Sequence, residues 1–328
     1  MLMRTISFRE AINEALFEEM SKDKNVYILG EDVGEFGGAF GVTKGLYQKY
    51  GAKRVIDTPL SEAAIAGAAV GSAVTGMRPV AEIMYIDFST IAMDQIVNQA
   101  AKMRYMFGGK AILPIVFRTQ CGAGSGMAAQ HSQSLEAWFN HIPGLIVVMP
   151  STPYDAKGLL KTAIRDNNPV IYIEHKLLYS EKGEIPDEEY LIPIGKADIK
   201  KKGKDVTIIS YSRMIHFVLE AARELKEAGI DAEVIDLRSI KPLDEETIYQ
   251  SITKTGRAVI VHEACKNGGV GGEIIARIID SEAFDYLEAP IKRVCGYDVP
   301  IPYNQRLERL ALPTKERIIN TVKQIVNI

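Results

Sequence analysis

Glu62 is the residue of this chain whose setting most favours acid–base chemistry. It ends the run DTPLSE at residues 57–62, and the nine residues after it are all Ala, Gly, Ile or Val. Thr58 can cap a helix there and Pro59 suits its first position, so we expect a helix packed against other backbone on every side. A carboxyl buried beside apolar side chains has a raised pKa and is a candidate acid–base group. The alternative is a first-turn carboxylate stabilised by the helix dipole.

A second candidate, His131, lies near the end of a glycine-rich loop expected over residues 119–133. Gly122, Gly124 and Gly126 allow a ligand to approach the backbone closely, and loops on a rigid sheet often carry function. The other four histidines stand at the edges of expected elements, where a structural role is more usual. No two histidines have the spacing of metal ligands, so we do not expect a zinc site.

The run AIRDNNP at residues 163–169 indicates a helix end followed by a turn into a strand. The last carbonyls of a helix lack partners within it. A turn that folds such carbonyls together can hold a hard cation through oxygen ligands. Ordinary capping by water and asparagine is the alternative, and the residues alone leave both open.

The run GGVGG at residues 268–272 precedes an expected helix and suggests a dinucleotide site. The G-x-G-x-x-G pattern requires a third glycine at the position of Ile274. We therefore favour a helix start that packs closely on its sheet.

Composition predicts an ordinary globular protein. The 328 residues are 47% apolar and 25% charged, which is typical of two domains with buried cores. Because 39 basic and 42 acidic residues leave a formal charge of −3, nucleic acid is not an expected partner. No stretch reaches the roughly 20 apolar residues of a membrane span, and we see no signal-peptide pattern. Three scattered cysteines suit a reducing compartment, so we expect a cytoplasmic protein.

Strand and helix patterns alternate along the chain, which predicts an α/β fold of two parallel-sheet domains. Buried strands are expected near residues 26–29, 79–84, 115–118, 145–149 and 170–174, with helices such as 88–106 between them. The charged, turn-rich stretch 181–204 is expected to be a linker. The alternation then resumes at residues 206–210. We therefore predict one domain at 1–180 and a second at 205–328.

Five motifs together resemble one known family, the β subunit of the thiamin-diphosphate-dependent component of 2-oxoacid dehydrogenase complexes. They are DTPLSE (57–62), EIMYIDF (82–88), AAQHSQ (128–133), AIRDNNP (163–169) and GYDVP (296–300). The resemblance covers essentially the whole chain in order. SLEAWF (134–139) and MPSTPY (149–154) are most similar to the acetoin dehydrogenase branch, with the pyruvate dehydrogenase branch close behind.

The resemblance implies a pyrimidine-binding domain followed by a transketolase C-terminal-like domain. Glu62 then corresponds to the carboxyl that hydrogen-bonds the aminopyrimidine ring of thiamin diphosphate and favours its imino form, from which the reactive ylid is made. Leu60, Met84 and Phe88 match positions that line the pyrimidine pocket. His131 matches a histidine proposed to act in transfer of the product to a lipoyl group.

The resemblance also implies metals and partners. A structural potassium ion would be held mainly by backbone carbonyls of Ile115, Ala163, Ile164, Asp166 and Asn168. The family holds the diphosphate and a magnesium ion with a Gly-Asp-Gly motif, which does not occur in this chain. That half of the cofactor site is therefore expected on an α subunit, in an α2β2 assembly. Asp298 matches the region that contacts the lipoyl-bearing acyltransferase core.

Three hypotheses follow for function. In the first, the chain is the β subunit of an oxidoreductase that cleaves acetoin or decarboxylates pyruvate and passes a two-carbon unit to lipoyl-lysine. In the second, it is a non-catalytic scaffold subunit of the same fold, against which Glu62 and His131 count. In the third, it is a nicotinamide-linked dehydrogenase that uses the glycine run near residue 270.

Overall fold

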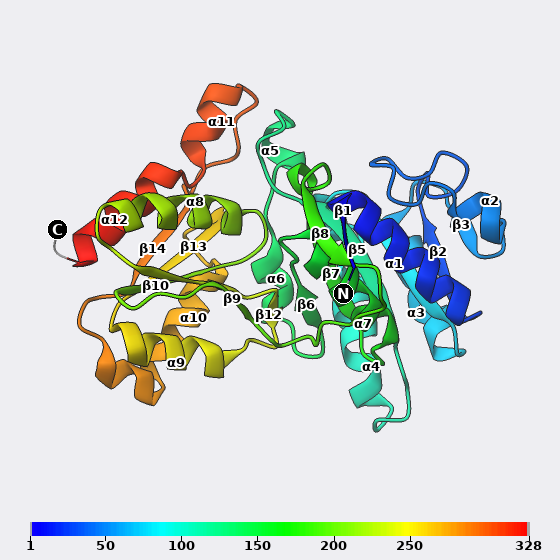
Figure 1. The fold of residues 1–328 in the computed structure, drawn as a ribbon. Coiled ribbons are helices and arrows are strands. Elements are labelled where there is room, and N and C mark those ends of the chain that lie inside the picture. The colour runs from blue at the N-terminus through cyan, green and yellow to red at the C-terminus, as the bar shows by residue number, and fades with distance from the viewer. Residues whose placement is uncertain (1, 327–328) are drawn as a thin grey trace. The chain divides into compact units, whose positions relative to one another are not determined.

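A computed structural model describes residues 2–326, which form two compact units (Figure 1). The first unit contains the chain up to Cys121 together with Trp138–Ile194. The second contains Gly122–Ala137 and the chain from Gly195 onward. The backbone therefore passes between the units three times.

The first unit is built on a parallel sheet. Six of its strands are hydrogen-bonded in the order β6-β7-β5-β4-β2-β3, and each neighbouring pair is parallel. These strands are β2 (Val26–Gly30), β3 (Val55–Asp57), β4 (Arg78–Ile83), β5 (Val116–Cys121), β6 (Ile146–Val148) and β7 (Val170–His175). Every residue of β2, β5 and β7 is buried, which confirms the expectation of strands covered on both faces.

Helices α1 and α7 lie side by side in this unit (Figure 1), and α3 packs on β2 and β4. Ser7 caps α1 in a reciprocal box with Glu10, and Thr152 caps α7 with Pro153 at its first position. The helical elements are α1 (Phe8–Lys22), α2 (Leu46–Tyr50), α3 (Glu62–Val74), η1 (Ile86–Thr90), η2 (Asp94–Ala100), α4 (Ala101–Met106), α7 (Pro153–Arg165) and η3 (Lys176–Leu178).

The second unit has a five-stranded sheet in the order β14-β13-β10-β11-β9, parallel except for β9 at its edge. Helices α8 and α12 cover one face, and α9 and α10 cover the other (Figure 1). The strands of this sheet are β9 (Asp198–Lys201), β10 (Val206–Ser210), β11 (Ala232–Asp236), β13 (Ala258–Cys265) and β14 (Lys292–Gly296). A further strand, β12 (Ser239–Lys241), follows β11 in the sequence and is not part of this sheet. The helical elements are α5 (Ala128–His131), α8 (Met214–Glu227), α9 (Glu245–Thr255), α10 (Val270–Ile279), η4 (Glu282–Tyr286), α11 (Gln305–Ala311) and α12 (Lys315–Val326), and α6 (Glu136–His141) follows α5.

The stretch 181–204, expected to be a linker, contains two strands in the structure. Its first part forms β8 (Lys182–Pro186), which pairs antiparallel with β1 (Met3–Ser7), a strand not predicted before the first helix. Its last part forms β9, so the stretch is built into both units. Residues 122–137, expected in the first domain, cluster with the second because their backbone groups bond to it.

Two predicted helices also differ. α3 begins at Glu62, not after Thr58, because the Thr58 N–H bonds to the Gly30 carbonyl and continues the strand pairing. The helix expected over 88–106 is divided into η1, η2 and α4, of which η2 is a π-helix. Ser89 and Thr90 hydroxyls donate to carbonyls three residues back, a local bonding that competes with regular helix at this point.

Arg118 forms a fully buried ionic network in the first sheet. Its guanidinium bonds Glu82 at 2.6 Å and Glu174 at 2.6 and 2.8 Å, and all three side chains are at most 2% exposed. Tyr179 donates to Glu174 at 2.6 Å, and Gln120 donates to Glu82 at 3.4 Å. Burial raises the pKa of Glu82, which Arg118 opposes. The network ties β4, β5 and β7 together below the carboxyl ends of the strands.

We expect Arg118→Met to lower the free energy of unfolding by about 3–5 kcal/mol, because it leaves two buried carboxyls without their cation. Urea unfolding of the purified chain measures this change. Lys53→Met removes an exposed cation and is the matched control. A loss for Arg118→Met no larger than that of the control would contradict the role given to the network.

The glycine run near residue 270 is explained by packing on His262. A β-carbon at Gly269 would lie 2.6 Å from the His262 ring, and one at Gly271 would lie 2.9 Å from it. The ring is fully buried between a carbonyl of Ala264 at 3.1 Å and the thiol of Cys295 at 3.3 Å. Burial lowers the pKa of His262 to about 4. The expectation of a helix start packed closely on its sheet is confirmed.

His262 predicts a pH dependence of stability. Since the unfolded imidazole has a pKa near 6.5 and the folded one near 4, the unfolded chain binds the proton more tightly. Stability should therefore fall as the pH drops from about 6.5 to about 4, by about 3 kcal/mol in total. Urea unfolding at several pH values in this window, compared with His262→Gln, isolates this contribution. An unchanged pH slope in the variant would contradict it.

Candidate functional site

The candidate residues of the first unit follow neighbouring parallel strands. Glu31 comes directly after β2, the run ending at Glu62 follows β3, and Met84 follows β4. Because β4, β2 and β3 are adjacent and parallel, their carboxyl ends meet at one edge of the sheet. This edge is where open α/β sheets bind ligands.

Two carboxyls are buried together at this edge. Glu62, the first residue of α3, and Glu31 are each 9% exposed, which confirms the expected burial of Glu62. Burial, followed by the negative charge of Glu62, raises the pKa of Glu31. Asp57 holds the loop after Glu31 by accepting from the Gly34 N–H at 2.6 Å. A β-carbon at Gly34 would lie 2.3 Å from that carboxylate, so only glycine allows this approach.

Glu31 was missed as a site residue by the sequence reading. Its signal was present, since it stands between Gly30 and Asp32 directly after a predicted buried strand. The structure adds that this strand, β2, is the neighbour of β3, so that Glu31 and the run ending at Glu62 follow adjacent strands.

The residues expected to line a pyrimidine pocket have different settings. Met84 and Phe88 are half-buried on either side of Tyr85, whose backbone has a positive φ of 64°. The side chain of Gln120 accepts from the Tyr85 N–H at 3.1 Å and so links this turn to the Arg118 network. Leu60 is 83% exposed in the chain by itself, so it is not enclosed with the others.

Helix α3 is not buried on every side, contrary to the expectation. Ile65, Ala66, Ala69, Val70 and Ala73 are buried, whereas a second stripe of the helix is exposed. This exposed stripe comprises Ala64, Ala68, Gly71 and Val74. The small apolar residues of α3 therefore lie both on a face that packs within the chain and on a face that is exposed.

His131 belongs to the second unit, where it ends the short helix α5 and is half-buried. The turn before it contains Ala128 with a φ of 60°, an uncommon conformation for a residue with a side chain. Neighbours of His131 line a cavity of about 410 Å³. Ser132, Leu135, Cys265, Tyr297 and Pro300 are among its lining residues. This cavity lies within the second unit and contains no residue of the Glu62 edge.

The expected cation turn already holds a positive charge. The guanidinium of Arg78 donates to the carbonyls of Ile164 at 2.9 Å and Asp166 at 2.7 Å. The carbonyl of Ile115 accepts from the Val170 N–H, and that of Ala163 accepts from the Asp166 N–H. The segment before β5 does lie against this turn, as a shared site requires. The potassium site stays a prediction, and an ion would share two of its carbonyls with Arg78.

Within residues 2–326 no group of three or more His, Cys, Asp and Glu side chains is arranged to hold a metal ion. Over the same residues, every helix is too short or too polar to span a membrane. The three cysteines form no disulfide within residues 2–326; Cys265 is exposed, and Cys121 and Cys295 are buried.

Comparison with known proteins agrees with this geometry. The transketolase pyrimidine-binding domain matches residues 4–182, and the transketolase C-terminal domain matches residues 195–318. A split-gene transketolase, described as an inactive β4 tetramer, has the same fold, with a TM-score of 0.81 at 23% identity and 98% coverage of both chains.

Relatives of known function are similar over nearly the whole chain. The β subunit of the mitochondrial pyruvate dehydrogenase E1 component of Caenorhabditis elegans is 49% identical, over 99% of this chain and 93% of the relative. The β subunit of acetoin:2,6-dichlorophenolindophenol oxidoreductase of Cupriavidus necator is 51% identical, over 97% and 96%. That of Bacillus subtilis is 49% identical, over 99% and 98%. This chain therefore belongs to the family of β subunits of thiamin-diphosphate-dependent pyruvate and acetoin dehydrogenase components.

Proposed function

We propose that the chain is the catalytic β subunit of an acetoin or pyruvate dehydrogenase component and binds the pyrimidine half of thiamin diphosphate. One observation carries the proposal: the buried carboxyl of Glu62 stands beside Glu31 at the carboxyl edge of β2 and β3. A carboxyl in this setting suits a ring nitrogen with which it exchanges a proton. Met84 and Phe88 provide half-buried apolar surface next to this edge.

Thiamin diphosphate, when bound, supplies a carbon nucleophile and an electron sink. Glu62 orients the pyrimidine ring and holds a proton at its nitrogen. Glu31 accepts or returns that proton, since burial and the charge of Glu62 favour its protonated form. His131 acts in the later transfer of the two-carbon unit to lipoyl-lysine.

The diphosphate and its magnesium ion are held by an α subunit, in an α2β2 assembly. The chain has no Gly-Asp-Gly motif, and its exposed apolar residues support a partner surface at the first unit. Leu60 is 83% exposed and Val74 is 45% exposed, both next to or within α3. A lipoyl-bearing acyltransferase core is the further partner, contacted near Asp298. Three cysteines without a disulfide among the described residues support a cytoplasmic location.

The scaffold and dehydrogenase alternatives have less support. A scaffold does not require two buried carboxyls whose negative charges repel each other. A nicotinamide dinucleotide would require open space at the glycine run, where Gly269 and Gly271 pack against His262 instead. Relatives of both the acetoin and the pyruvate branch have similar identity, so assays of the reconstituted enzyme on both substrates identify the branch.

We expect Glu62→Gln to lower kcat by roughly 10²–10⁴-fold while leaving the assembly with the α subunit intact, because it removes one proton-transfer group. Turnover with acetoin and with pyruvate, and size-exclusion chromatography of the αβ complex, measure the two effects. Glu282→Gln, an exposed change in the second unit, is the control. Near-normal turnover would contradict the role of Glu62 and favour a scaffold.

We expect tight, magnesium-dependent binding of thiamin diphosphate only when both subunits are present, because each supplies one half of the site. Calorimetric titration of the chain alone, of the α subunit alone and of their complex makes the comparison. Tight magnesium-dependent binding by this chain alone would contradict the shared site. NADH fluorescence in the same samples tests the third hypothesis, and binding there would support it.

A further inference from the structure

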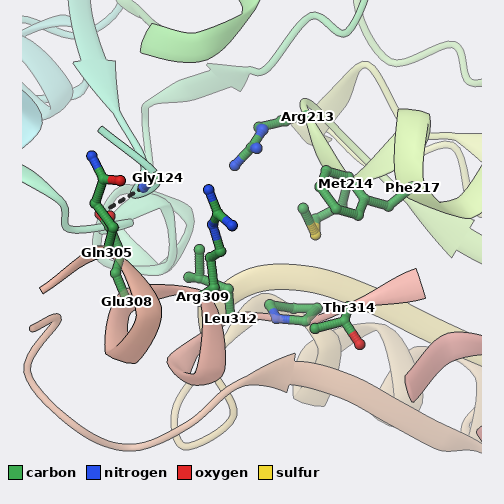
Figure 2. Close-up of a pocket in the computed structure, with 10 residues that line it drawn as sticks. Gly124, Arg213, Met214, Phe217, Gln305, Glu308, Arg309, Leu312 and Thr314 are labelled. Atoms are coloured by element: carbon green, nitrogen blue, oxygen red, sulfur yellow. Dashed lines mark hydrogen bonds between the residues drawn. The ribbon is translucent and has the colours of Figure 1, made fainter. Parts of the chain in front are cut away.

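The loop that carries His131 is fastened to the second unit by two buried carboxylates. Glu263 accepts from the Ala123 N–H at 2.6 Å. Glu308 accepts from the Gly124 N–H at 2.7 Å (Figure 2). It also accepts from the Gly126 N–H at 3.1 and 3.3 Å. Glu308 is 1% exposed and Glu263 is 9% exposed.

The acceptor Glu308 has no cation to offset its burial. Among residues 2–326 it forms no ion pair, so the N–H groups of the loop are the partners of its carboxylate. Glu263 has Arg213 at 3.8 Å, beyond hydrogen-bonding distance. Hydrogen bonds to a charged acceptor are stronger than those between neutral groups, and a buried charge without them is costly. Carboxylate and loop therefore stabilise each other.

The loop needs such partners because its backbone is irregular and includes one residue with a side chain, Ala128, in an uncommon conformation. Gly122, Gly124 and Gly126 have φ values of 94°, 101° and 70°, and Ala128 has a φ of 60°. Its ends are closed by the Gly122 N–H, which donates to the Gln133 carbonyl at 3.0 Å. A strained conformation persists only where its surroundings hold it.

The far end of the loop is held by a hydrogen bond to one of its own carboxyl groups. Tyr211 donates to the carboxyl of Glu136 at 2.8 Å, and Glu136 is 1% exposed. Tyr211 follows β10, and Glu263 lies near the end of β13, the neighbouring strand. From β10 the chain crosses to β11 on one side and later to β13 on the other, so this is the crevice where such sheets bind ligands. Here the chain's own loop occupies that place.

We propose that Glu263 and Glu308 are positioning residues, which hold the 122–137 loop in the conformation that presents His131 for transfer to the lipoyl group. The proposal rests on the role of His131 in the proposed function. It assigns these two carboxylates a part in that reaction, in addition to their structural role. Both carboxylates act through the loop, because their observed hydrogen bonds are to its backbone N–H groups.

Glu308 gives the sharper test. Glu308→Ala removes all of its bonds to the loop, and Glu308→Gln keeps its volume and one acceptor but removes the charge. Arg309→Gln is the matched control, since Arg309 is on the same helix and its side chain extends into the adjoining cavity of about 420 Å³ (Figure 2). The three variants are compared in the αβ complex, together with His131→Ala.

Amide hydrogen exchange of peptides covering residues 122–131 is the first measurement. We expect exchange to accelerate roughly ten- to a hundred-fold in Glu308→Ala and less in Glu308→Gln, with Arg309→Gln unchanged. The reason is that charge-assisted bonds protect these amides. Unchanged exchange in both Glu308 variants would overturn the proposal, and the Gln variant decides the matter if the Ala variant does not fold.

Two activities separate this proposal from the proposed function. We expect the Glu308 variants to slow transfer to lipoyl-lysine more than reduction of an artificial electron acceptor, as His131→Ala should. If His131→Ala slows transfer and Glu308→Ala does not, the positioning role is overturned. If His131→Ala itself leaves transfer unchanged, the role of His131 in the proposed function is wrong. Amide hydrogen exchange then decides by itself whether Glu308 holds the loop.

Discussion

Burying a carboxylate is costly, and the chain meets this cost in three different ways. In the first sheet, Arg118 supplies a cation to two acids and completes a network within the chain. In the second unit, carboxylates accept backbone N–H groups of a strained loop. At the carboxyl edge of the first sheet, Glu31 and Glu62 are both buried, and burial followed by the negative charge of Glu62 raises the pKa of Glu31. The third arrangement lies at the edge where open α/β sheets bind ligands, and that is where acid–base chemistry fits.

The three arrangements are connected through the order of the parallel strands. The Arg118 network spans β4, β5 and β7, and through Gln120 it also holds the turn at Tyr85, which precedes the half-buried Phe88. β5 ends at Cys121, and the residues after it form the 122–137 loop, which the two carboxylates hold. Rigid elements thus determine where the functional segments begin, which is the usual way for an α/β fold to place its site.

Much of this could be predicted from the sequence. The continuous apolar strands and the alternation with helices predicted two mostly parallel sheets, and the family comparison confirms that fold. Burial of Glu62 followed from its apolar surroundings. What local patterns could not predict were pairings between distant segments, such as β1 with β8, and hydrogen bonds such as that between Glu308 and Gly124, which are 184 residues apart. Glu31 was missed for the same reason, since its neighbour comes from another strand.

The second unit is discontinuous in sequence, and this limits how the protein can be divided. A fragment that begins at Gly195 would contain both acceptors, Glu263 and Glu308, but none of the N–H groups that satisfy them. Both carboxylates would lose the N–H groups that satisfy them here. Exchange of the carboxyl-terminal half with that of a relative would likewise combine acceptors from one protein with a loop from another. The two halves of this fold have therefore to change together, although sequence models describe them as separate modules.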